Sequence, residues 1–195
     1  MAVVVVGSGG YAVSCIDVLE ASGLAVTACL DPDDELAATI TAGTKVFVAV
    51  MDNRARQALS AGIRSHGAVV VSAVSPRAVV SPSVQLGAGV LLMPGAVVNA
   101  NTSIGDGAVI NTNAAVDYEV AVGSFAHVAV GASLAGGVSV GDGALIGVGA
   151  SVTPGRTIGA WSTVGAGSAV VRDVPPGATV AGVPAKTTYG SAVRR

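Results

Sequence analysis

The chain of 195 residues is 51% hydrophobic and only 11% charged, with a net charge of −2. This composition is too apolar for a disordered chain, and without a basic stripe we expect no nucleic-acid partner. No uninterrupted apolar run reaches the length of about 18 residues that a membrane-spanning helix needs, and the first residues lack the basic start of a signal peptide. We therefore expect a cytoplasmic protein without a membrane partner.

The first third of the chain alternates between strand and helix patterns. Short apolar runs bounded by Gly, Pro or Asp predict buried strands, and longer amphipathic stretches predict helices. The predicted strands are 2–6, 25–30, 45–51 and 68–73, and the predicted helices are 11–22 and 54–65. This alternation is typical of a small parallel α/β unit.

A glycine-rich turn, Gly7-Ser8-Gly9-Gly10-Tyr11, joins the first strand to the first helix. Such a turn presents backbone N–H groups to a phosphate, although many such turns only pack a helix against a strand. Asp31, at the end of the second strand, is suited to meet a ribose or base edge, or to cap a turn. The sequence therefore leaves open whether the turn binds a phosphate or only packs the helix, and whether Asp31 contacts a ligand or caps a turn.

From Val74 to Val170 every sixth residue is Val, Leu or Ile, without a break over 17 positions. A period of six fits neither a helix, with period 3.6, nor a lone strand, with period 2. It is typical of a chain coiled into a triangular prism, with one hexapeptide on each face and three in each coil. We therefore predict a parallel β-helix within a domain of residues 74–195.

Two other positions of the hexad support this prism. The residue four places after each aliphatic is usually Ala, Ser or Thr, so one large and one small side chain would fill each face. Gly recurs directly after the aliphatic, as at Gly105, Gly123 and Gly141. We expect these glycines to supply corner backbone angles that other residues avoid.

Titratable side chains are sparse on the prism. With two Cys and two His in the chain, we expect no zinc or other metal site, and we expect Cys15 and Cys29 to be buried thiols. One cluster stands out: Asp117-Tyr118-Glu119 precedes His127, and Asn111 lies just before both. Tyr118 and His127 are nine residues apart, which is half a coil. They could share a site only across a subunit boundary, which favours a trimer.

Several segments beyond the repeat carry a specific combination of motifs. They are Val5–Gly10, Leu30–Asp31, Val48–Arg56, Ser81–Ser83, Met93–Pro94, Ile110–Thr112, Phe125–Ala132, Leu134–Val138 and Ala181–Lys186. Together they resemble the bacterial left-handed β-helix acetyltransferases of the sugar-nucleotide type. These include enzymes that N-acetylate UDP-4-amino sugars and the sialic acid O-acetyltransferase-like proteins.

The resemblance implies a homotrimer that binds acetyl-CoA between adjacent left-handed coils, against the usual crossover rule. It also implies that residues 1–73 form a Rossmann-like domain that holds the nucleotide of the acceptor, a UDP-sugar. By position, the residues expected to contact acetyl-CoA are His127, Val148 and Ala166. The residues expected to contact the acceptor are Gly9, Gly10, Tyr11, Asp31, Pro32 and Asn111.

The sequence departs from the family where chemistry is expected. The family's general-base His is Tyr118 here, and the acidic residue that supports that His corresponds to Glu119. A tyrosine phenol, with a reference pKa near 10, is a poor base at neutral pH. The family's Gly-Gly-His turn also reads Gly9-Gly10-Tyr11, and the stretch from Asp31 to Lys45 is shorter than in the family.

Three interpretations follow. In the first, His127, Asp117 or Glu119 acts as the base of an acetyl transfer. In the second, the acceptor is an amine of low pKa that Tyr118 only orients by hydrogen bonding. In the third, the chain is a non-catalytic trimeric homologue. We favour acetyl-CoA-dependent N-acetylation of a nucleotide-linked amino sugar or a small amine. O-acetylation is the weaker alternative, because a hydroxyl acceptor needs stronger base catalysis.

Overall fold

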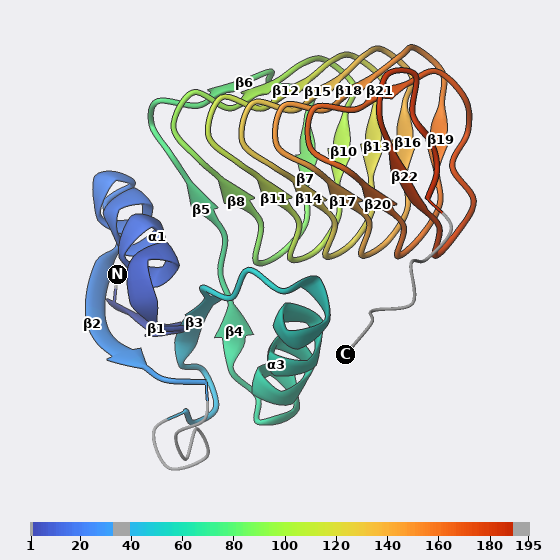
Figure 1. The fold of residues 1–195 in the computed structure, drawn as a ribbon. Coiled ribbons are helices and arrows are strands. Elements are labelled where there is room, and N and C mark those ends of the chain that lie inside the picture. The colour runs from blue at the N-terminus through green and yellow to red at the C-terminus, as the bar shows by residue number, and fades with distance from the viewer. Residues whose placement is uncertain (1, 33–39, 189–195) are drawn as a thin grey trace, which may run out of the picture.

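The computed structural model describes residues 2–32 and 40–188 (Figure 1). A four-stranded parallel sheet with two helices lies against the first coils of a long β-helix. The strand order in the small sheet is β2-β1-β3-β4. The elements are β1 (Ala2–Val6), α1 (Gly9–Ala21), β2 (Ala25–Leu30), β3 (Lys45–Val48), α3 (Asn53–Ser65) and β4 (Val69–Val70).

The first two strands match the sequence prediction, and later boundaries differ for local reasons. β4 covers only two residues because the chain leaves the sheet at Ser72, whose hydroxyl donates to the Gly87 carbonyl in the β-helix at 3.1 Å. α1 begins at Gly9 rather than Tyr11, so the Gly9-Gly10 pair forms the first turn of the helix. α3 begins after Asp52, whose carboxylate accepts a 2.8 Å hydrogen bond from the Ala55 N–H as a side-chain cap.

The two helices cover opposite faces of the small sheet. α1 buries Cys15 and Leu19 against Val5 and Phe47, and the same cluster continues onto Leu91 of the β-helix. α3 packs on the other face, where its Ile63 is buried against Val46 and Val48 of β3. The expectation of two buried thiols is wrong for Cys29, because β2 is an edge strand and leaves that side chain exposed.

The β-helix has three flat faces. Face 1 consists of β5 (Ala73–Val74), β8 (Leu91–Leu92), β11 (Val109–Ile110), β14 (His127–Val128), β17 (Leu145–Ile146), β20 (Thr163–Val164) and β22 (Thr179–Ala181), with β23 (Lys186–Thr187) antiparallel to β22. Face 2 consists of β6 (Val79–Val80), β9 (Val97–Val98), β12 (Ala115–Val116), β15 (Ser133–Leu134), β18 (Ser151–Val152) and β21 (Ala169–Val170). Face 3 consists of β7 (Gln85–Leu86), β10 (Ser103–Ile104), β13 (Ala121–Val122), β16 (Ser139–Val140) and β19 (Thr157–Ile158).

Each coil aligns with the next in a constant register. On face 1, for example, Val109 pairs with His127 and His127 with Leu145. From β8 to β21 the second residue of each strand points inward, and these aliphatic side chains form one continuous core along the prism. Small residues such as Ala126 and Ala144 are fully buried beside them, as the sequence predicted.

The role predicted for the glycines after each aliphatic is wrong. Gly105 and Gly123 are not at positive φ. They are needed for space, because a Cβ on Gly105 would lie 2.5 Å from the Ser124 nitrogen of the next coil. The left-handed corner positions come two residues later, as at Gly107 (φ 63°) and Gly143 (φ 63°).

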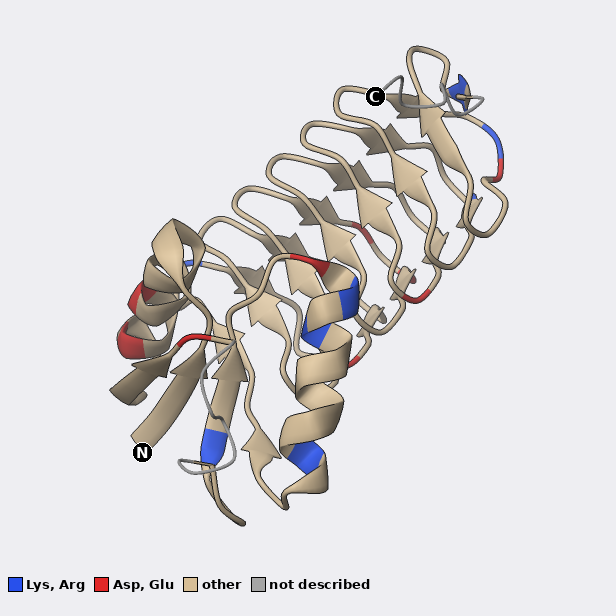
Figure 2. Cartoon of the chain, turned by 60° about the horizontal axis from the view of Figure 1, so that its bottom comes forward, with Lys and Arg blue, Asp and Glu red and all other residues tan. Residues whose placement is uncertain are grey.

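Charged residues are concentrated on the N-terminal unit and along the corners of the coils, and the flat faces of the β-helix carry few (Figure 2). No helix within residues 2–32 and 40–188 has the length and apolar character needed to cross a membrane.

Candidate functional site

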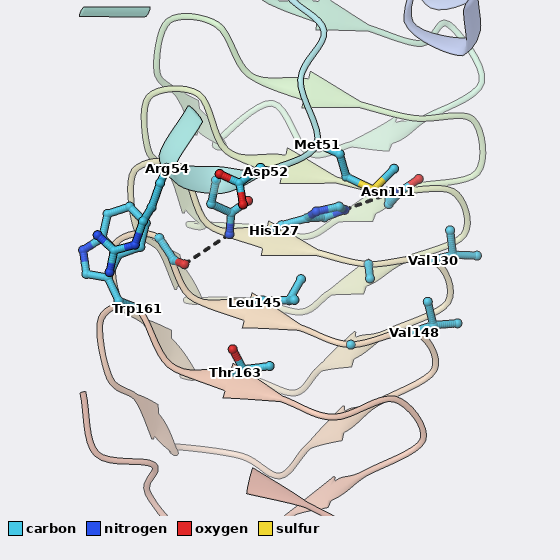
Figure 3. A pocket seen from close by; sticks show the side chains of 14 residues that line it. Met51, Asp52, Arg54, Asn111, His127, Val130, Leu145, Val148, Trp161 and Thr163 are labelled. Atoms are coloured by element: carbon cyan, nitrogen blue, oxygen red, sulfur yellow. Dashed lines mark hydrogen bonds between the residues drawn. The ribbon is translucent and has the colours of Figure 1, made fainter. Parts of the chain in front are cut away.

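A cavity of about 650 Å³ lies on face 1, beneath the loop that joins β3 to α3 (Figure 3). Its lining comes from the N-terminal unit and from successive coils of the β-helix. The lining residues are Met51, Asp52, Asn53, Arg54, Asn111, His127, Ala129, Val130, Gly143, Leu145, Gly147, Val148, Trp161 and Thr163. A volume of this size is in the range of small-molecule sites.

The start of α3 is fixed to one corner of the β-helix, the column Gly107, Phe125, Gly143 and Trp161, spaced one coil apart. Asn53 Nδ2 donates to the Gly143 carbonyl at 3.1 Å. The guanidinium of Arg54 lies over the Trp161 ring, 4.1 Å from its centroid. Each side chain therefore reaches a different coil, which sets the height of the loop above the cavity.

Arg56 provides the strongest part of this attachment. Its side chain is only 2% exposed, and all five of its N–H groups donate hydrogen bonds within the protein. The acceptors are the carbonyls of Gly107 (2.8 Å), Val50 (3.0 Å), Met51 (2.9 Å) and Phe125 (2.9 Å), and Asn53 Oδ1 (2.8 Å). Arg56 therefore links the N-terminal unit to two coils without a paired carboxylate.

His127 lies in the middle of the cavity, in the outward position of β14 (Figure 3). Asn111, one coil earlier, holds it: Asn111 Oδ1 accepts from the Thr112 N–H at 2.8 Å, so its Nδ2 is the donor to His127 Nε2 at 3.1 Å. Because Nε2 accepts this bond, we assign the proton of the neutral ring to Nδ1.

Burial favours the neutral form of this imidazole. The side chain is 4% exposed, and this desolvation, with the nearby positive charge of Arg56 adding to it, lowers the pKa of His127 to about 4. At neutral pH His127 is therefore a hydrogen-bond donor through Nδ1, with the Nε2 lone pair already occupied.

The cavity does not contain Tyr118 or Glu119. Both lie at the corner between face 2 and face 3, where Glu119 adopts φ 55° and the Tyr118 side chain is 54% exposed. The Tyr118 ring lies over Gly136 of the next coil, since a Cβ there would sit 2.6 Å from the Tyr118 Cζ. Within one chain, Tyr118 therefore lies apart from His127, as their spacing of half a coil predicted.

Of the other residues predicted for the site, some line the cavity and some lie outside it. Asn111, His127 and Val148 line the cavity, whereas Ala166 lies exposed and outside its lining. Gly9, Gly10 and Tyr11 begin α1, and Asp31 and Pro32 follow β2, so none of the five lines this cavity. Burial raises the pKa of the Tyr11 phenol well above its ordinary range. In the described part of the chain, no group of three His, Cys, Asp or Glu side chains gathers as a metal site would require.

No model of a protein family matches the chain, and no curated protein sequence matches it. Solved structures do. PerB from Caulobacter crescentus, in complex with CoA and GDP-perosamine, is 45% identical with a TM-score of 0.91, over 97% of this chain and 98% of that one. Histidine variants of the perosamine N-acetyltransferase of the same bacterium are 43% identical. The acetyltransferase domain of PglB from Neisseria gonorrhoeae, with acetyl coenzyme A, is 31% identical with a TM-score of 0.87, over 96% of this chain and 98% of that one.

The chain belongs to the left-handed β-helix sugar N-acetyltransferases. The predicted left-handed β-helix is thereby confirmed, and so is the family resemblance. A Rossmann-like domain was predicted for the N-terminal unit. The structure shows a parallel sheet there, with a helix on each face.

The residues by which the N-terminal unit of this family member closes the cavity were not predicted from the sequence. They are Met51, Asp52, Asn53 and Arg54, with Arg56 behind them, and Arg54 contacts Trp161 of the β-helix. One signal was present, because Trp161 is the only tryptophan of the chain and occupies a corner position of the hexad. The pairing of Arg54 with Trp161 has no sequence signal, since the two residues lie far apart in the chain.

Proposed function

We propose that this protein transfers the acetyl group of acetyl-CoA to the amino group of a nucleotide-linked amino sugar. The observation that carries the proposal is the cavity on face 1, where a buried neutral His127 faces a site large enough for both reacting groups. The 45% identity to an enzyme solved with CoA and GDP-perosamine supports this substrate class.

The nucleotide expected from sequence was UDP, and the comparison favours testing GDP first. We propose that the Rossmann-like N-terminal unit holds the nucleotide at the ends of β1 and β2. There, Gly7 approaches Ala49 so closely that a side chain on Gly7 would collide with the Ala49 backbone. Asp31 and Pro32 directly follow β2 at the same edge of the sheet. With acetyl-CoA and a nucleotide sugar as substrates, we infer a cytoplasmic location.

CoA is proposed to approach along the corner between face 1 and face 2. Val130 and Val148 are exposed there, one coil apart, and both line the cavity. Ala166 continues the same column by one more coil. Exposed aliphatic side chains in a row suit the apolar part of a pantetheine arm, and they lead toward His127.

The proposed reaction forms an N–C bond and breaks a C–S bond. The neutral amine attacks the thioester carbonyl carbon, and the carbonyl oxygen gains negative charge in the tetrahedral intermediate. The His127 Nδ1–H is suited to donate to that oxygen, a type of stabilisation that often exceeds other catalytic effects. The intermediate collapses and the CoA thiolate leaves. The amine loses one proton, and the thiolate gains one to become the free thiol.

His127 is a poor acceptor for that proton, because Asn111 occupies Nε2 and burial disfavours the charged ring. We therefore assign the removal of the amine proton to the corner that carries Tyr118 and Glu119. Tyr118 would orient the amine, and Glu119 or solvent would take the proton. Because this corner lies outside the cavity of its own chain, we propose a homotrimer in which it completes the site of a neighbour.

Mixed trimers test the shared site directly. His127→Ala and Tyr118→Phe variants, each weakly active alone, should regain activity when unfolded and refolded together, because some sites then combine an intact His127 with an intact Tyr118. Light scattering gives the oligomeric state of each sample. No gain on mixing two correctly folded variants would contradict the shared site.

Activity itself is tested by incubating the protein with acetyl-CoA and a panel of amines, and measuring free thiol together with the mass of the product. The panel contains GDP-linked and UDP-linked 4-amino sugars and small amines of low pKa. Thiol release only with a nucleotide-linked amine supports the proposal. Release of no thiol above background with any acceptor would favour the non-catalytic homologue that Tyr118 also suggests.

A further inference from the structure

Two arginines lie two residues apart at the start of α3 and have opposite surroundings. Arg56 is buried with every N–H group bonded. Arg54 is exposed, and its side chain makes no hydrogen bond or ion pair with any residue in the described part of the chain. The contact it does make is with the Trp161 ring, 4.1 Å from the guanidinium carbon to the ring centroid.

Trp161 is fixed in place by the backbone of its corner. It adopts φ 57°, a left-handed conformation that is rare for a bulky residue. Its ring packs against Gly143 one coil earlier, where a Cβ would overlap the ring. A guanidinium stacked on such a ring keeps the N–H groups at its edge available for a ligand.

Arg54 and Trp161 line the same cavity as His127. Figure 3 shows them together at one end, with Val130 and Val148 at the other end and His127 between. The one carboxylate in the lining is Asp52, which caps α3 through the Ala55 N–H at 2.8 Å. The first turn of α3 contains no acidic residue, so Asp52 is the carboxylate that offsets the positive end of the helix dipole, and Arg54 supplies the cationic N–H groups.

We propose that Arg54, held over the Trp161 ring, binds a diphosphate group of one of the two substrates in this cavity. Planar guanidinium groups bind phosphate oxygens in a bidentate way, and a stacked one loses less freedom on binding. This inference rests on the proposed function, since both of its substrates carry a diphosphate.

The geometry favours the nucleotide sugar as the source. Its diphosphate is attached to the sugar that carries the amine, so one cavity can hold both the diphosphate at Arg54 and the amine near His127. In CoA the whole pantetheine arm separates the diphosphate from the thioester.

The test measures binding by calorimetry with GDP, UDP and CoA, separately, to the intact protein. Arg54→Gln should weaken the binding of the nucleoside diphosphate by about 10- to 100-fold, as loss of a charged hydrogen-bond pair typically does. Arg64→Gln is the matched control: it removes the same charge from the same helix, at a surface pair with Asp106, and should leave binding unchanged. Arg54→Lys keeps the charge but not the planar fork, and should recover only part of the affinity.

Trp161→Asn supplies a second variant, since Asn tolerates the left-handed corner. It should weaken the binding of the same ligand as Arg54→Gln does, by a smaller factor. A loss of CoA affinity alone would assign the diphosphate to CoA. Unchanged affinity for all three ligands in Arg54→Gln, or wild-type protein that binds none of them, would overturn the inference. Failure of the proposed function has a different signature: nucleoside diphosphate binds and depends on Arg54, but no acetyl group is transferred.

Discussion

The buried imidazole of His127 gives the protein a specific sensitivity to acid. The folded state holds this ring neutral down to a pKa of about 4, whereas the unfolded chain protonates it near its ordinary pKa of 6.5. Between these two values the unfolded state binds more protons, so the free energy of unfolding rises with pH and falls on acidification. From pH 7.5 to pH 5, His127 should account for a loss of about 2 kcal/mol per chain.

The measurement is urea denaturation at both pH values, at one protein concentration. His127→Gln removes the titrating ring and keeps an oxygen that can accept from Asn111, so this variant should lose about 2 kcal/mol less than the wild type on acidification. His66→Gln is the matched control, because His66 is exposed at the end of α3 and its hydrogen bonds are local. If His127→Gln and wild type lose the same stability between the two pH values, the imidazole is not held neutral by burial.

Further predictions concern the domain attachment, the Tyr118 corner and the pH dependence of turnover. Arg56→Met leaves four backbone carbonyls without their donor and should lower stability by about 3 kcal/mol or more, whereas Arg64→Met should cost less than about 1 kcal/mol; thermal denaturation checks both. Gly136→Ala should displace the Tyr118 ring and lower turnover by about tenfold without unfolding, whereas Gly62→Ala, in an open position of α3, should keep turnover and raise stability by up to about 1 kcal/mol. Between pH 5.5 and 8, the pH profiles of kcat/KM of the wild type and of His127→Gln should have the same shape. The pKa of His127 lies near 4, so this ring does not titrate in that range.

Some features of the site follow from local sequence rules and some do not. The unbroken hexad register defines the faces and corners of the β-helix, so Asn111, His127 and Val148 could be placed on neighbouring coils from the sequence. The same register separated Tyr118 from His127 by half a coil. The capping of α3 by Asp52 was equally local, because an Asp before a helix accepts from the first N–H groups.

The corner glycines show where a local rule fails. Gly105 and Gly123 follow inward aliphatic residues, and we expected them to supply unusual backbone angles. Their backbone is ordinary, and it is the next coil that leaves no room for a Cβ. A contact between coils cannot be recognised from the neighbours of a glycine in sequence.

The sequence by itself determined the repeating architecture, because a period of six imposes the same packing on every coil. Tertiary structure alone decided what faces the cavity. Arg56 reaches Gly107 and Phe125, and Arg54 reaches Trp161, although each partner lies far along the chain. These contacts depend on how the α/β unit docks on face 1, and that docking is set by surface shape and by buried carbonyls that need a donor. No periodic pattern encodes either of these.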